Sequence, residues 1–232
     1  MAISARSGAQ TAMKITFSLG LLLSCLVLAS CTSNPVPPDW KVNSHGALNT
    51  AVAAYLKGNT RLADIEFSRA RNEIASTARL DLLARSTLVR CAARVASLEW
   101  DDCPEYQALA TDAGPGEGDY ADFISGRWKG LQAERLPQHY RALLSTPTAT
   151  SIAAIKDPLA QLVAAGALLR TGRIDPVVIN IATDTASAQG WRRPLLAWLS
   201  VQAKNAEDEG NMAEAAQIRR RIALVTSQGG AN

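Results

Sequence analysis

Apolar residues recur at steps of three and four along most of the chain, which is the spacing of one face of an α-helix. The pattern predicts helices that begin near residues 44, 60, 77, 158, 176, 194 and 212. Glycines separate several of them, and Asp157-Pro158 and Asp175-Pro176 have the form of an N-cap followed by proline in the first turn. The β-branched run 177–181 lies between helical patterns with no partner strand, so we interpret it as helix. The expected fold class is all-α.

The segment 104–145 is less regular than the rest. Residues 114–118 alternate glycine with proline and glutamate, and predict a loop. Aromatic residues at 120, 123 and 128 suggest a helix after that loop, and Tyr140 marks another short one.

The N-terminus follows a different pattern. Residues 15–30 are apolar or small and uncharged, and Arg6 and Lys14 precede them without any acid. This order is typical of a signal peptide. The apolar run is about 16 residues, short of the roughly 20 that span a bilayer, so a permanent transmembrane helix is the weaker interpretation. Met13 is an alternative start to Met1 and would give a more compact signal.

The apolar run ends in Leu28-Ala29-Ser30-Cys31, which resembles the lipobox of bacterial lipoproteins. The resemblance implies cleavage before Cys31 and lipid attachment to that cysteine. Thr32 stands where an aspartate would imply inner-membrane retention, so the resemblance implies a periplasm-facing protein anchored in the outer membrane. An ordinary secreted protein cut after an A-x-A-like site is the alternative.

These features divide the chain into three parts: a signal peptide at 1–30, a lipidated cysteine with a proline-rich tether at 31–43, and a helical domain at 44–228. The signal holds two of the 24 basic residues and none of the 21 acids, so the mature chain carries a net charge of only +1. Such a balance argues against a nucleic-acid partner, which would require a clustered basic excess.

Two cysteines, Cys91 and Cys103, remain in the expected helical domain. Thiols in an oxidising periplasm tend to pair, so we expect a disulfide between them. A buried free Cys91 on a helix face is the alternative. The chain contains no C-x-x-C, and neither this spacing nor the two histidines predict a metal site or a cofactor.

Gly58, Ala63, Phe67 and Ala70 are spaced like the turn glycine, small residue, aromatic and second small residue of a tetratricopeptide-type repeat, which the segment resembles. Residues 210–215 repeat the beginning of this pattern. The resemblance implies antiparallel helical hairpins stacked in a short α-solenoid, with small residues at the close contacts. An irregular helical bundle is the alternative, because helix-capping rules alone make hairpins look alike.

No nucleophile elbow or phosphate-binding loop is present. His45 and His139 lack ligand spacing, and the run 219–221 of three arginines is typical of a solvated helix face. Six carboxylates could supply an acid–base pair, although sequence cannot bring any two together: Glu66, Glu105, Glu117, Asp119, Asp122 and Glu134.

We therefore expect a non-enzymatic adaptor that holds an envelope protein at the membrane. A cell-wall hydrolase would instead require two convergent carboxylates, drawn from 104–145. A small-ligand-binding lipoprotein would show an apolar cavity around Trp128 and Trp198. Of the five tryptophans, one or two exposed at a groove could anchor a partner (Trp40, Trp100, Trp128, Trp191 and Trp198).

Overall fold

The structure, a computed structural model, describes residues 36–227, where all regular secondary structure is helical. The signal peptide and Cys31 lie outside the described residues. The long helices are α2 (Asp39–Leu56), α3 (Thr60–Ala75), α4 (Leu80–Ala96), α9 (Pro158–Arg170), α10 (Pro176–Ala188), α11 (Arg192–Asp208) and α12 (Met212–Ser227). Between α4 and α9 lie shorter helices: α5 (Pro104–Gln107), α6 (Pro115–Ile124), α7 (Arg141–Ser145), α8 (Ala149–Ala153), and the 3₁₀ turns η2 (Ala110–Asp112), η3 (Ala133–Arg135) and η4 (Gln138–Tyr140). The all-α expectation is confirmed.

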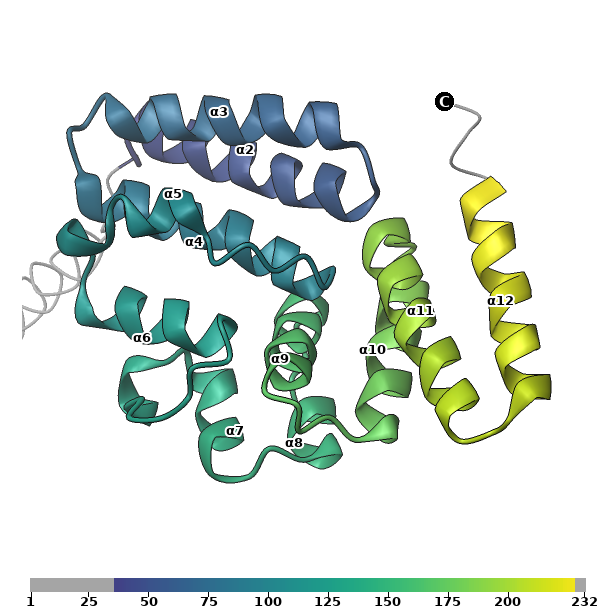
Figure 1. Cartoon of the computed structure of the whole chain (residues 1–232). Helices are drawn as coiled ribbons and strands as arrows, with labels where there is room; N and C mark the ends of the chain where they lie inside the picture. Colours follow the sequence, from purple (N-terminus) through teal and green to yellow (C-terminus); the bar gives the residue numbers. More distant parts are fainter. Residues whose placement is uncertain (1–35, 228–232) are drawn as a thin grey trace, which may run out of the picture. The chain divides into compact units, whose positions relative to one another are not determined.

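Antiparallel hairpins occupy both ends of the described chain (Figure 1). At the N-terminal end α2 packs on α3, and at the C-terminal end α9, α10, α11 and α12 pack in sequential order. Helix α4 lies between the two ends and contacts α2, α3, α6 and α9. The short helices α5–α8 form the irregular part that the sequence indicated.

The first hairpin turns at Gly58, whose φ of +89° lies in the left-handed region that favours glycine. Asn59 then caps α3 by accepting a hydrogen bond from the backbone N–H of Leu62 at 3.1 Å. Ala63, Phe67 and Ala70 are buried. This face of α3 packs against α2 and against Ala93 of α4.

The largest apolar cluster joins α4, α6, α9 and α10, and includes the fully buried Trp198 of α11. Gly166 of α9 lies against the backbone of α4, where a Cβ would overlap the carbonyl oxygen of Val95. The two helices approach this closely because Gly166 has no side chain.

Two predicted boundaries were wrong. Helix α2 begins at Asp39, not at residue 44. Pro38 directly precedes its first residue, and the negative charge of Asp39 is favourable at the positive N-terminal end of a helix. Residues 115–118 form the first turn of α6 instead of a loop, with Pro115 in the first helical turn, where its missing N–H costs nothing.

The β-branched run 177–181 is helical, as interpreted from the sequence. Both Asp-Pro caps form as expected: Asp157 accepts from the N–H of Ala160, and Asp175 from that of Val177, each at 2.7 Å. Cys91 and Cys103 are joined by the expected disulfide, with their Cα atoms 5.8 Å apart. The bond ties α4 to the start of α5.

Candidate binding pocket

A pocket of about 680 Å³ lies between α4, α6, the segment 134–141 and the start of α9; we call it the central pocket. Leu88 and Ala92 of α4, Leu136, and Leu159 and Val163 of α9 supply its apolar lining. Helical spacing places the α4 and α9 residues on one face of each helix, and the packing of α4 on α9 brings the two faces together. The volume lies within the range of ligand-binding pockets in proteins.

Two tyrosines form the aromatic side of the central pocket. The rings of Tyr120 and Tyr140 lie 5.9 Å apart, and the ring of Phe123 lies 4.8 Å from that of Tyr140. Trp128 stacks on Phe123 at 5.1 Å and donates its indole N–H to the Phe123 carbonyl, which fixes this aromatic group. Burial raises the pKa of Tyr120 to about 12, and also raises the pKa of Tyr140. Both hydroxyls are therefore protonated at neutral pH.

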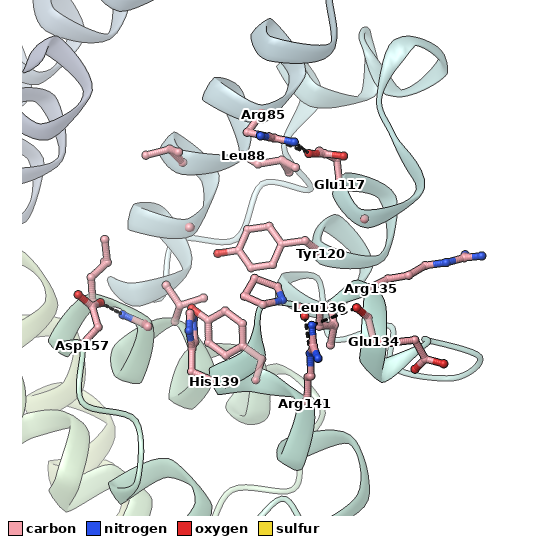
Figure 2. Close-up of a pocket in the computed structure, with 18 residues that line it drawn as sticks. Arg85, Leu88, Glu117, Tyr120, Glu134, Arg135, Leu136, His139, Arg141 and Asp157 are labelled. Carbon is pink, nitrogen blue, oxygen red and sulfur yellow. Dashed lines mark hydrogen bonds and ion pairs between the residues drawn. The ribbon is translucent and has the colours of Figure 1, made fainter. Parts of the chain in front are cut away.

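The charged groups at the central pocket are mostly engaged with other protein groups (Figure 2). Glu117 accepts a hydrogen bond from Arg85 at 2.8 Å, and Asp157 caps α9. Arg141 donates to two backbone carbonyl oxygens, at 2.9 and 3.2 Å. Burial lowers the pKa of His139, partly opposed by Asp157, so this imidazole is neutral at pH 7.

Of the carboxylates considered for acid–base chemistry, Glu117 and Glu134 line the central pocket, and the other four do not. Glu66, Glu105, Asp119 and Asp122 each lie within 4.0 Å of a different arginine. Glu134 lines the central pocket, but its side chain turns away from it (Figure 2).

The cavity does not lie where the small-ligand hypothesis placed it. Trp198 is fully buried and donates its indole N–H to the Ala96 carbonyl oxygen at 3.1 Å, so it contributes to the core. Trp128 packs behind Phe123 and does not line the central pocket. Of the two histidines, His139 lines the central pocket, while His45 is exposed on α2 beside Asn49. Arg219 pairs with Glu207 on the surface.

The sequence pointed to part of this site and missed part of it. Glu117 and Glu134 were candidates on chemical grounds, whereas His139 was interpreted as a surface residue and the aromatic residues of segment 104–145 only as parts of helices. Arg85 was not a candidate, because nothing local distinguishes it from a surface residue, and Asp157 was predicted only as a helix cap.

Among residues 36–227, no group of three or more His, Cys, Asp or Glu side chains could hold a metal ion. In the same part of the chain no helix combines the length and apolarity needed to cross a bilayer. No protein-family model, curated protein or solved structure matches this chain.

Proposed function

We propose that this protein is a lipoprotein anchored through Cys31 in the outer membrane, where it faces the periplasm and acts as a non-enzymatic adaptor for another envelope protein. The proposed localisation rests on the order of basic region, apolar run and lipobox in residues 1–31. The adaptor role rests on the central pocket, and in particular on the observation that Glu117 and Asp157 are engaged with other protein groups while most of the remaining lining is apolar or aromatic.

This composition suits the side chains of a peptide segment. Leu88, Leu159 and Val163 offer apolar contact, and the rings of Tyr120 and Tyr140 form the aromatic side of the pocket. Glu117 is already paired with Arg85, so a cationic ligand would compete with that arginine for it, and most of the lining offers no charged partner. We therefore expect an uncharged segment that carries one large apolar or aromatic side chain.

A small-ligand-binding lipoprotein is the second candidate, favoured by the pocket's volume of about 680 Å³. Native mass spectrometry of the protein released gently from membranes separates the two. A constant added mass below about 1 kDa would indicate a small molecule, and a protein-sized complex would indicate an adaptor.

A substitution that fills the central pocket tests the site. Leu159→Trp should prevent recovery of the protein that mild crosslinking captures with the wild type. The matched control is Leu224→Trp, because Leu224 is 64 % exposed on α12, outside the pocket. Circular dichroism checks that both variants are folded. Equal recovery of the same partner by both variants would contradict the assignment.

The anchor is tested separately. Cys31→Ser should abolish incorporation of labelled fatty acid and leave uncleaved precursor in the cell. Labelled, processed protein from this variant would show that Cys31 is not the lipidated residue.

A further inference from the structure

Trp100 is a large exposed apolar side chain beside an apolar groove. It belongs to the connection between α4 and α5, residues 97–103, which we call the Trp100 loop. Trp100 is 40 % exposed, whereas Trp198 is fully buried. Tryptophan is one of the residue types most enriched among the few side chains that dominate protein–protein binding energies.

Three helices hold the Trp100 loop through arginines. Arg94 of α4 pairs with Asp101 at 2.8 Å, and Arg193 of α11 pairs with Glu99 at 2.9 Å. Arg170 of α9 pairs with Asp102. Contacts from three directions leave the loop little freedom to rearrange.

The backbone of the Trp100 loop is also held in an uncommon conformation. Leu98, Asp102 and Cys103 have φ values of +59°, +57° and +54°, a region that residues other than glycine rarely adopt. The disulfide from Cys103 to Cys91 closes the loop onto α4. Such positions persist where the surroundings over-determine them, and they cluster at functional sites. The loop therefore presents Trp100 in one preorganised position, which reduces the entropy lost on binding.

The Trp100 groove has a volume of about 750 Å³ and lies between the Trp100 loop, the turn from α9 to α10, and α11. It shares no lining residue with the central pocket. Its α11 side is a stripe at helical spacing: Ala197, Ser200, Val201, Lys204 and Asp208. The stripe covers about three helical turns, or roughly 16 Å. The small side chains of Ala197 and Ser200 allow a second helix to approach α11 closely.

The charges along the Trp100 groove are matched in pairs. Lys204 pairs with Asp208 at 2.9 Å on α11, and Arg170 pairs with Asp102 on the opposite side. The groove therefore offers apolar contact from Trp100 and Val201 with no net charge. An occupant bearing a charge on its contact face would lose hydration without gaining a partner.

We propose that the Trp100 groove docks one amphipathic helix of a partner protein, with an uncharged apolar face lying along α11 and one large apolar side chain packed against Trp100. A helix fits because the α11 stripe is straight and three turns long. An uncharged face fits because the charges in the groove are already paired. This surface is separate from the central pocket, so it gives the protein a second point of attachment.

The test uses the full chain and fluorescein-labelled helical peptides in anisotropy titrations. One peptide carries leucines at helical spacing on one face with alternating Lys and Glu on the other, and the matched peptide has two of those leucines replaced by glutamate. The wild type should bind the first peptide at least tenfold more tightly than the second. Trp100→Ala should weaken that binding at least tenfold, and Met212→Ala, which removes a side chain 61 % exposed on α12, should leave it unchanged.

Reduction of the disulfide provides a second measurement that leaves Trp100 itself intact. Reduced protein should bind the apolar peptide several-fold more weakly while its circular dichroism spectrum is retained. Equal affinity of wild type and Trp100→Ala, or of the two peptides for the wild type, would overturn the proposal. A dimer that depends on Trp100, detected by light scattering at the same protein concentrations, would assign the groove to a second copy and would also overturn it.

Discussion

The α2–α3 and α11–α12 hairpins have the same type of turn, but the second helix of each hairpin packs differently. Gly58 and Gly210 have φ values of +89° and +77°. Asn59 and Asn211 follow them, and each donates its backbone N–H to a carbonyl five residues back at 2.8 Å. Each asparagine side chain then accepts from a backbone N–H three residues on. The shared Gly-Asn sequence thus specifies the turn and the helix cap locally.

The two hairpins differ after the turn. Helix α3 buries Phe67 between α2 and α4, whereas the corresponding position of α12 is Arg219, whose side chain is 62 % exposed and pairs with Glu207. Helix α12 buries only Ala215 and Ile218. The comparison shows that a repeat-like start specifies a hairpin, while the later apolar position decides whether a further helix packs on it.

The largest expected effect is at the position where the hairpins diverge. Phe67→Ala should lower the free energy of unfolding by about 3–5 kcal/mol, because it leaves a cavity between α2, α3 and α4. Arg219→Ala removes only a surface ion pair and should cost less than about 1 kcal/mol. Urea denaturation of the full chain measures both. Similar losses would mean that α12 is packed as tightly as α3.

The buried alanines sharpen the comparison. Ala63 and Ala215 are 1 % and 0 % exposed at matching positions of the two hairpins. Ala63→Leu should cost about 1–3 kcal/mol, because α3 is confined between α2 and α4. Ala215→Leu should cost less, because α12 packs on α11 alone among the helix pairs with substantial contact and can shift outward. Thermal melting of the two variants, compared with wild type, tests the order, and a larger loss for Ala215→Leu would reverse it.

The turn glycines should behave more alike. Gly210→Ala should cost about 1 kcal/mol from the left-handed backbone alone, since a Cβ there would meet nothing within 4 Å. Gly58→Ala should cost slightly more, because its Cβ would come within 2.8 Å of the Arg192 guanidinium. Paired melting curves measure the difference. A stabilising Gly210→Ala would show that the turn is not held in the left-handed region.

The smallest effects belong to the exposed side of α3. Ser68 and Arg69 face solvent, so changing either to alanine should alter the free energy of unfolding by less than about 0.5 kcal/mol. These variants are the baseline for Phe67→Ala in the same denaturation series. A loss of about 2 kcal/mol for Arg69→Ala would show that the solvent-facing side of α3 has been assigned wrongly.

Sequence reasoning succeeded where interactions lie within one or two helical turns. The long helices, the caps at Asp157 and Asp175, and the turn at Gly58 follow from neighbouring residues. It failed at residues 115–118, where glycines suggested a loop although proline begins α6. For the central pocket it named Glu117 and Glu134 but not the apolar and tyrosine lining, because each wall comes from a different part of the chain.

By itself the sequence determined an all-α chain of capped helices, since capping, periodicity and turn chemistry act between near neighbours. Only the tertiary structure decided how the helices meet. Gly166 resembles any glycine inside a helix until Val95 lies against it. Arg193 resembles a surface residue, yet it donates to the Tyr55 carbonyl at 2.9 Å and to the Thr60 hydroxyl at 2.6 Å, across more than 130 residues. Such contacts depend on which helix faces pack together, and that packing cannot be inferred from residues that are close together in the sequence.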